Sequence, residues 1–457
     1  MDLSETVRER ALDRAVRKAY WRLLPLLFLC YVIAYIDRVN VGFAKLNMQK
    51  DLEPQGFTES VFGFGMGIFF LGYLLLEIPG TLLVERWSAR KWICRIMVTW
   101  GVIAALTAFV REPWQFYTVR FLLGLAEAGF FPGVIVYLTH WFPSRDRTRA
   151  LAWFLIGTPI AQMVAPPLSE VFMGIGVGDR PPVLGLVGWQ WVFIVWGIPA
   201  VVLGIVVLAT LTDRPRHAGW LSEEERTALE GELERERAEQ KARSGHMGVL
   251  GALKHPKVLA LAAAYFFVVT GNYGVELYMA SILQDWYGLD VKKVAYLIII
   301  PPIGSLIGQL FIGWSSDRTR ERRWHAALPI VMGALALFLA PASQGQVAVT
   351  VGLFTVAMTG LKAYLPAFWA LPSLLMTESA AAASIGMINS FGNLGGWVGP
   401  SVLGFVKQAT QEYRYGLWFL GASMLVSALI IVNLGIGRRA AAVGGRIVAD
   451  EALPEPA

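Results

Sequence analysis

Long apolar runs separated by short polar segments dominate the chain. A transmembrane helix needs about 20 mostly apolar residues, and twelve stretches meet this requirement. The predicted spans are 23–46, 61–84, 92–110, 114–141, 149–172, 188–211, 257–284, 293–315, 325–342, 347–372, 381–407 and 414–436. Only the segment 212–256 is both long and polar. The pattern therefore predicts an all-α membrane protein with twelve transmembrane helices in two six-helix halves.

The polar segment and the chain ends set the predicted domain boundaries. The N-terminal half covers 1–211 and begins with a charged, amphipathic segment (Met1–Arg22) ahead of the first span. A charged linker follows at 212–256, then the C-terminal half at 257–437 and a tail at 438–457. The loops after spans two and eight both run from an acid through arginine to a basic cluster, so we expect the halves to be pseudosymmetric. Such repeats are a transporter architecture.

Composition supports a membrane location, because 55% of the 457 residues are hydrophobic and only 16% are charged. Soluble domains carry about 25% charged residues, so a soluble globular enzyme is excluded. The net charge is +6, and most of the lysines and arginines fall in loops on the side of the N-terminus. Since cytoplasmic loops carry such an excess, it reflects topology rather than nucleic-acid binding. We expect a multi-pass protein of a bacterial cytoplasmic (inner) membrane, with both termini cytoplasmic.

Motifs of enzymes and of ATP-driven pumps are missing from the sequence. There is no Walker motif, no HExxH zinc site and no GxSxG nucleophile elbow. The two cysteines, Cys30 and Cys94, lie in or beside apolar stretches, where packing is their expected role. We therefore expect a protein that is not an enzyme, is not driven by ATP and holds no metal or cofactor. No stable protein partner is implied, so we expect a monomer, with protons as the coupling ion.

Ionisable residues inside spans are costly and usually face a cavity or a partner. Apart from Glu77 near the inner end of span two, those of this chain fall in spans one, four, seven and ten. They are Asp37, Arg38, Arg120, Glu127, Glu276 and Lys362. These spans hold equivalent positions in a repeat of three helices, so the residues are predicted to line one central cavity.

Two hypotheses account for Asp37, Arg38, Arg120 and Glu127. The four residues could neutralise one another with no ligand. Alternatively, the arginines bind a carboxylate, which suits their rigid fork of donors. A carboxyl group in mid-membrane is pushed toward its neutral form by desolvation and toward its charged form by arginine. A group balanced between these effects can exchange a proton, so we predict proton coupling by Asp37 and Glu127.

Glu276 and Lys362 leave a similar choice open. They could pair with each other, or Lys362 could bind a substrate anion while Glu276 joins in proton coupling. Neutral polar and aromatic residues in the spans complete the candidate substrate site, although each could serve helix packing instead. They are Tyr35, Tyr73, Gln162, Asn272, Trp369, Asn389 and Asn393.

The basic loops are predicted to form a charge network that closes the cytoplasmic side. Its candidate members are Glu85, Arg86, Arg90, Asp317 and Arg318. Glu77 is expected to pair with these loops. Breaking such a network would open a transporter inward.

Several motifs resemble a known family over nearly the whole chain. The loop Gly80…Glu85-Arg86…Arg90-Lys91 resembles the loop signature of the major facilitator superfamily. More specific are YIDRVNVGF at 35–43, RFLLGLAEAGFFPG at 120–133, WFP at 141–143, FWALP at 368–372 and INSFGNLGG at 388–396. Together they resemble the anion:cation symporter branch, in its tartrate, phthalate and hydroxyphenylacetate permease group.

The resemblance implies the major facilitator fold and proton-coupled uptake of an organic carboxylate. It gives the coupling and binding site to Asp37, Arg38, Arg120 and Glu127, and a substrate contact to Asn393. Tyr35 and Tyr73 match cavity positions. Two positions, Glu276 and Lys362, depart from the tartrate-type pattern. Lys362 as a second cation would suit a dicarboxylate, and the two residues together would suit a zwitterion.

Three functions are compatible with these sequence features. The first is a proton-coupled importer of small organic anions that works by alternating access. The second is an exporter or proton antiporter of drug-like or zwitterionic solutes on the same fold, against which Arg38 and Arg120 argue. The third is a membrane sensor or membrane-embedded enzyme, for which the chain offers neither a soluble domain nor a nucleophile set.

Overall fold

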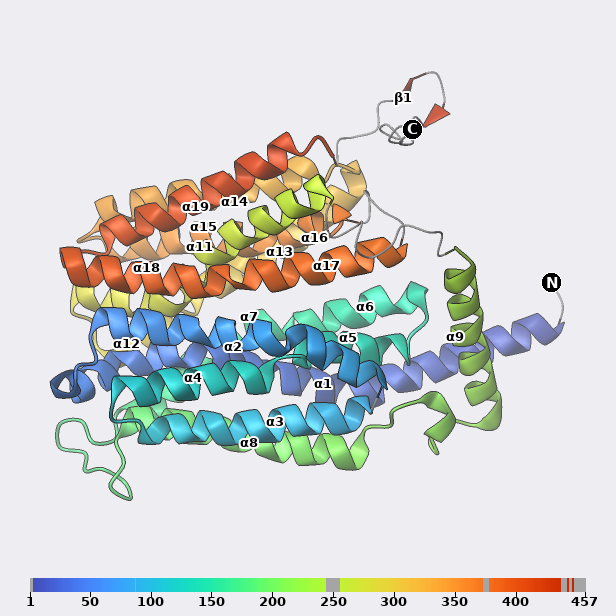
Figure 1. The fold of residues 1–457 in the computed structure, drawn as a ribbon, viewed down its shortest axis with the longest axis horizontal. Helices are drawn as coiled ribbons and strands as arrows, with labels where there is room; N and C mark the ends of the chain where they lie inside the picture. Colours follow the sequence, from blue (N-terminus) through green and yellow to red (C-terminus); the bar gives the residue numbers. More distant parts are fainter. Residues whose placement is uncertain are drawn as a thin grey trace. The chain divides into compact units, whose positions relative to one another are not determined.

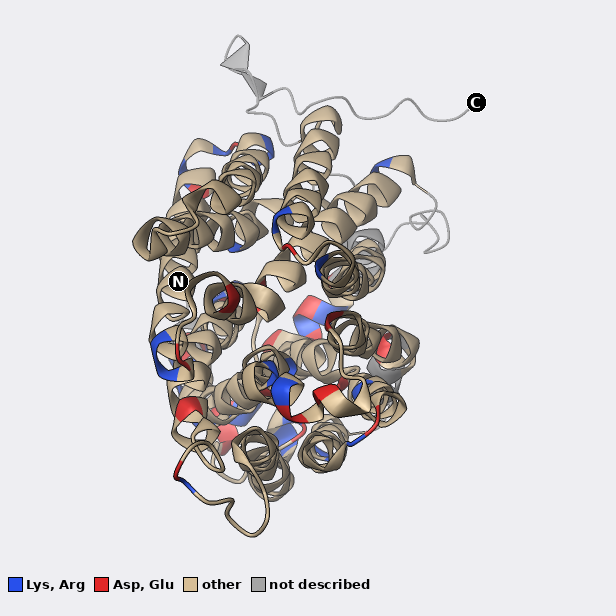
Figure 2. Cartoon of the chain, turned by 90° about the vertical axis from the view of Figure 1, so that its left-hand side faces the viewer, with Lys and Arg blue, Asp and Glu red and all other residues tan. Residues whose placement is uncertain are grey.

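The computed structural model describes residues 3–86, 88–243, 255–372 and 378–436, together with two short paired strands, β1 (Ala442–Val443) and β2 (Arg446–Ile447). Side chains at 3–6, 78, 80–86, 148, 240–243, 378–383 and in the two strands are outside this description. Nearly all of the described backbone is helical (Figure 1). Most of the ribbon in Figure 2 is neither acidic nor basic, as a lipid-facing protein requires.

The chain divides into two compact units. The first unit comprises 1–244, 276–299 and 400–411. It contains α1 (Leu3–Leu52), α2 (Glu59–Arg86), α3 (Ala89–Leu106), α4 (Pro113–Glu127), α5 (Phe130–Thr139), α6 (Ser144–Leu155), α7 (Gly157–Met173), α8 (Gly188–Thr210), α9 (Glu223–Arg243) and α12 (Val291–Leu297). Short 3₁₀ turns lie at η1 (Glu53–Gln55), η2 (Thr107–Phe109) and η3 (Pro215–His217).

The second unit comprises 245–275, 300–399 and 412–457. It contains α13 (Ile300–Thr319), α14 (Arg323–Leu339), η4 (Ala340–Ser343), α15 (Val347–Ala363), α16 (Leu365–Phe368), α17 (Glu378–Asn393) and α19 (Arg414–Asn433). Two helices, α11 (Pro256–Tyr287) and α18 (Gly395–Thr410), begin in the second unit and end in the first. Within the second unit, Ser423 and Ser427 of α19 donate hydrogen bonds to carbonyls of α11.

Eleven of the twelve predicted spans are confirmed as helical segments long and apolar enough to cross a membrane, among the described residues. The remaining predicted span, 381–407, coincides with α17 and α18, which are separated only at Leu394. The all-α fold class is therefore confirmed.

The first helix differs from its prediction. The sequence suggests a separate amphipathic segment up to Arg22 and a span from residue 23, but α1 is one continuous helix of 50 residues. At 1.5 Å per residue it is about 75 Å long. The buried Ala15 and Ala19 belong to a small-residue stripe ahead of the apolar span, and α9 packs on this part of α1. A charged N-terminal segment can therefore continue the transmembrane helix.

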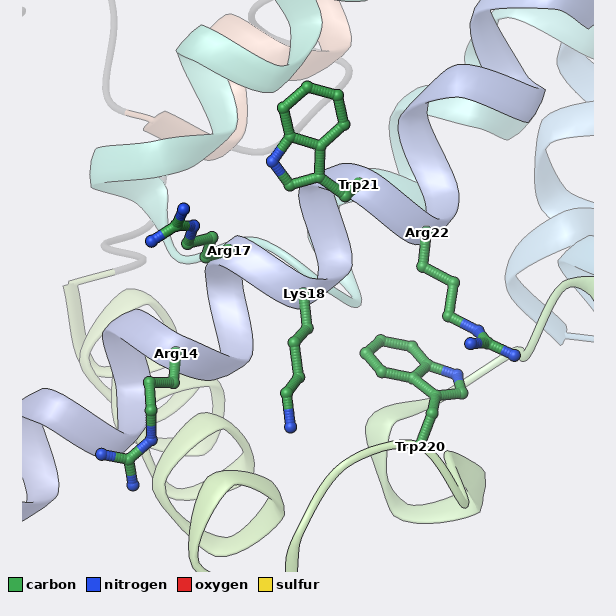
Figure 3. A pocket seen from close by; sticks show the side chains of 6 residues that line it. All are labelled: Arg14, Arg17, Lys18, Trp21, Arg22 and Trp220. Carbon is green, nitrogen blue, oxygen red and sulfur yellow. The ribbon is translucent and has the colours of Figure 1, made fainter.

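Salt bridges hold α9 against α1. Lys18 Nζ lies 2.7 Å from Glu225 Oε2, and Arg14 Nε lies 3.6 Å from Glu225 Oε1 (Figure 3 shows both basic side chains). Burial raises the pKa of the Glu225 carboxyl, but hydrogen bonds from Lys18 and the Ser222 backbone and the charge of Arg14 outweigh it and hold that pKa below its usual value. At neutral pH Glu225 is thus a charged anchor for the linker.

Five of the predicted spans are interrupted. The breaks lie at 128–129 in span four, 156 in span five, 298–299 in span eight, 364 in span ten and 394 in span eleven. The first break follows Glu127 directly, where Gly129 has φ +85°, a left-handed conformation that glycine adopts without strain. Spans four and five correspond to spans ten and eleven in the predicted repeat, so four of the five interrupted spans belong to corresponding pairs. Transporters commonly form their sites at such discontinuous helices.

Glycines bring neighbouring helices into backbone contact. A Cβ atom on Gly124 of α4 would lie 1.9 Å from the Phe69 carbonyl oxygen of α2. In α3 and α8, which lie side by side (Figure 1), a Cβ on Gly101 would lie 2.6 Å from the Gly197 carbonyl oxygen. Small residues at such crossings replace the hydrophobic effect with close van der Waals packing. Gly124 thus sets the distance between α2 and α4, and both helices contribute side chains to the site described below.

We expect Gly124→Ala to lower the melting temperature of the purified protein by several degrees, because overpacking at a rigid contact costs about 1–3 kcal/mol. Gly352→Ala is the matched control, since a Cβ there meets nothing within 4 Å and the change should leave the melting temperature unaltered or slightly raised. Equal melting temperatures for the two variants would contradict the proposed backbone contact.

Candidate functional site

Four ionisable residues come together from two helices of the first unit. Asp37 and Arg38 lie on α1, while Arg120 and Glu127 lie two turns apart on α4. Asp37 is 2% exposed, and Arg120 and Glu127 are each 1% exposed. Because α4 and the part of α1 at 23–46 are largely apolar, these side chains are among the few charged groups in their surroundings.

The contacts of these residues are unequal. Arg38 Nη2 forms an ion pair with Glu127 Oε1, and Asp37 Oδ1 accepts a hydrogen bond of 3.3 Å from Asn40 Nδ2. Arg120 makes no ion pair with any described residue, and its buried Nε and Nη1 atoms find no hydrogen-bond acceptor there. Of the two arginines, Arg38 is therefore paired with a carboxylate of the cluster, whereas Arg120 keeps N–H donors without an acceptor among the described residues.

Aromatic rings surround the two guanidinium groups. The Arg38 Cζ atom lies 5.5 Å from the ring centre of Phe69 and 5.4 Å from that of Tyr73. Arg120 Cζ lies 5.2 Å from the ring centre of Phe69. Such cation–π contacts favour the charged arginines without occupying their N–H donors. The donors of Arg120 therefore stay available for an anion.

A further carboxylate, Glu276 of α11, lies in the same unit. Its Oε1 atom accepts a hydrogen bond of 2.6 Å from the Tyr35 hydroxyl and another from the Gln162 side-chain amide of α7. The Tyr35 ring centre lies 5.9 Å from Arg38 Cζ. Tyr35 thus connects the Glu276 carboxylate to the arginine cluster, a link that sequence spacing does not reveal because the three helices are distant in the chain.

The other candidate substrate-site residues belong to the second unit. They are Asn272, Lys362, Trp369, Asn389 and Asn393. Asn389 and Asn393 are one turn apart on α17 and share a face. The Trp369 ring meets the Tyr265 ring edge-on at 5.0 Å.

Two of the predicted gate residues, Arg90 and Asp317, form ion pairs within their own units. The backbone N–H of Arg90 donates to Asp213 Oδ1 at 2.9 Å, and the Ser88 hydroxyl donates to Asp213 Oδ2 at 2.7 Å. Asp213 lies in the predicted linker, where no motif distinguishes it from the other acidic residues.

In the second unit, Asp317 pairs with Arg322 at 2.7 Å, and Arg318 Cζ lies 5.5 Å from the Trp314 ring centre. Glu85 and Arg86 end α2, but their side chains lie outside the described residues. Glu77, also on α2, is buried.

Sequence analysis missed a buried lysine. Lys45 is 1% exposed, and its Nζ atom lies 2.7 Å from Glu59 Oε2, 3.4 Å from the Ser281 hydroxyl and 4.3 Å from the Tyr278 ring centre. It lies two turns after Arg38 on α1. A lysine at that spacing inside a predicted span is the signal that could have identified it.

Comparison with known proteins now places the chain in a family. Residues 27–400 match the Major Facilitator Superfamily. The chain belongs to the Major Facilitator Superfamily. It is therefore a multi-pass membrane protein and a secondary transporter, and members of this family are not enzymes.

Relatives and solved structures agree with this assignment. A protein of Agrobacterium vitis named as a tartrate transporter is 41% identical over 434 residues, covering 95% of this chain and 97% of its own. A protein of Acinetobacter baumannii named as a quinolone resistance transporter is 39% identical, covering 91% of this chain and 93% of its own. The xylose transporter XylE of E. coli, in its inward-open form, has a TM-score of 0.71 at 16% identity, covering 91% of this chain and 96% of its own. The last similarity shows the fold.

We expect Lys45→Met to lower the melting temperature by several degrees, because it leaves the Glu59 carboxylate with a desolvation cost of about 1–3 kcal/mol and no cation. The double variant Lys45→Met/Glu59→Gln should recover most of the loss. Lys293→Met is the control, since its pair with Asp290 is exposed and should contribute little. If Lys45→Met melted at the same temperature as Lys293→Met, the ion pair would not stabilise the unit.

Proposed function

We propose that this transporter takes up a small organic carboxylate, of the tartrate, sugar-acid or aromatic-acid type, together with protons by alternating access. The observation that carries the proposal is the Arg120 guanidinium, which is buried and has two nitrogens without an acceptor among the described residues. A buried cation without hydrogen-bond partners is costly. An anionic ligand at this position would remove the cost.

The chemistry of the site favours a carboxylate among anions. Guanidinium donors form a planar fork that matches the two oxygens of a carboxylate. Phe69 and Tyr73 add flat apolar surface beside the arginines, which suits the carbon skeleton of an organic acid. The relative named as a tartrate transporter supports the same class of substrate.

Charge balance provides the argument for proton coupling. When all four residues are ionised, Asp37, Arg38, Arg120 and Glu127 sum to zero. A bound carboxylate adds one negative charge to a buried region, where uncompensated charge is strongly disfavoured. Protonation of Asp37 or Glu127 would restore neutrality. Substrate anion and proton would then bind together, which is the thermodynamic requirement for symport.

The remaining candidates receive roles in the same scheme. Glu276 joins the proton-coupling group, because its charge governs the hydrogen bonds of Tyr35 and Gln162. The second unit would contribute further substrate contacts, and the basic loops would act as the cytoplasmic gate. We further propose that the protein works as a monomer in a bacterial cytoplasmic membrane, with both termini in the cytoplasm.

Export of drug-like or zwitterionic solutes by proton antiport is the second candidate. The relative named as a quinolone resistance transporter favours it. The two functions differ in the charge of the solute, since a zwitterion carries a cationic group as well as a carboxylate for Arg120. Binding of simple organic acids that lack an amino group therefore favours the first function.

We expect Arg120→Met to weaken carboxylate binding about 10- to 150-fold, because a charged hydrogen-bonded pair contributes about 1.5–3 kcal/mol. Binding is measured as the ligand-induced rise in melting temperature with tartrate, gluconate and benzoate. The unliganded variant should be no less stable than the native protein, since the Arg120 guanidinium forms no ion pair with a described residue that the substitution would remove. Arg111→Met, at an exposed residue, is the control. Unchanged affinity in Arg120→Met would refute the site.

We expect Glu127→Gln to abolish proton-driven accumulation while retaining exchange, because the amide cannot take up or release the coupling proton. Uptake and counterflow are measured in proteoliposomes with and without a pH gradient, using the acid that binds best. Glu53→Gln, at an exposed site, should behave as the native protein does. Accumulation that survives in Glu127→Gln would transfer the coupling role to Asp37 or Glu276.

A further inference from the structure

Two of the candidate substrate-binding residues already have an acceptor within the protein. The Tyr35 hydroxyl of α1 donates a hydrogen bond of 2.6 Å to Glu276 Oε1, and the Gln162 side-chain amide of α7 donates to the same oxygen. Both donor residues are buried, whereas Glu276 is half-buried. Two helices thus direct donors to a single point, which an oxygen of Glu276 occupies.

This point lies beside the arginine cluster. The Tyr35 ring centre is 5.9 Å from Arg38 Cζ. The charges of Arg38 and Glu276 both act on the Tyr31 hydroxyl, one turn earlier on α1. The Glu276 carboxylate and the candidate carboxylate site are therefore parts of one region of the first unit.

Buried hydrogen-bond donors need an acceptor when no substrate is bound, because leaving them unsatisfied costs free energy. Glu276 supplies that acceptor to Tyr35 and Gln162. Its carboxylate is also the chemical group that the nearby arginines are suited to bind. Glu276 therefore offers the two donors the same chemistry that an acidic ligand would offer them.

We propose that Glu276 is an internal substitute for the substrate, which displaces it from Tyr35 and Gln162 on binding. The inference rests on the proposed function, in which Arg120 binds a carboxylate of the same substrate. Taking over the two donors requires a second oxygen acceptor on that substrate. The substrate class is therefore a dicarboxylate or a hydroxy acid rather than a simple monocarboxylate.

The test measures the apparent affinities of the purified full-length protein for tartrate and benzoate from the ligand-induced rise in melting temperature. The variant Glu276→Gln keeps the size of the side chain and removes its charge. Hydrogen bonds to a charged acceptor are about twice as strong as those to a neutral one, so the amide competes less well. Tartrate affinity should therefore rise about 10-fold, whereas benzoate, with one carboxylate and no further acceptor, should gain much less.

Tyr35→Phe tests whether the substrate takes over the hydroxyl. Alone, it removes the same donor from Glu276 and from the substrate, so tartrate affinity should change little. In the Glu276→Gln background it should remove much of the gain, and a merely structural contact would not produce this non-additivity. Asp285→Asn is the control, because this acid lies further along α11 in a partly exposed pair with Lys407 and its loss should leave both affinities unchanged.

The proposal is overturned if Glu276→Gln binds tartrate no more tightly than the native protein does. It is also overturned if benzoate gains as much as tartrate, since the variant would then act only through its charge. Either result leaves the proposed function in place as long as Arg120→Met still weakens carboxylate binding, so the two failures are distinguishable. Glu276→Asp, whose shorter side chain withdraws the carboxylate from both donors, repeats the test should Glu276→Gln fold poorly.

Discussion

The Arg120 guanidinium, which is buried and forms no ion pair with a described residue, constrains the arrangement around it. Its charge cannot be removed at neutral pH, so the surroundings must reduce its cost. The ring of Phe69 does so from one side, and the carboxylates of Asp37 and Glu127 act on it electrostatically without forming an ion pair. Glu127 forms its ion pair with Arg38, and Asp37 accepts a hydrogen bond from Asn40. Two nitrogens of Arg120 are therefore left without an acceptor among the described residues.

The backbone is adapted to this cluster. Helix α4 ends at Glu127, and Gly129 adopts a left-handed backbone conformation before α5 begins at Phe130. Gly124 brings α4 onto the backbone of α2 near Phe69, the residue whose ring faces both arginines. A larger residue at Gly124 would separate the ring from the guanidinium groups. The glycines of the 120–133 motif therefore serve the electrostatics of the site as well as helix packing.

Sequence alone predicted the helical spans and the identity of the charged residues within them, because both follow from the cost of polar groups in lipid. Contacts between distant helices could not be predicted in this way. The bonds from Tyr35 and Gln162 to Glu276 depend on how α1, α7 and α11 are rotated about their axes, which apolar composition does not specify. The contact of Asp213 with Arg90 could not be predicted either, because the charged linker contains many acidic residues and no motif distinguishes one from another. Lys45 looked like a loop residue because it lies at the end of its predicted span.

The unbroken length of α1 connects regions that the sequence treats as separate. Lys18 pairs with the linker helix, Arg38 pairs with α4 and Lys45 pairs with Glu59. Lys18 and Arg38 lie about 30 Å apart along the helix axis, and Arg38 and Lys45 lie about 10 Å apart. All three ion pairs are therefore carried by one continuous helix, so the charged cluster, the linker helix and the contacts of Lys45 are structurally connected through α1.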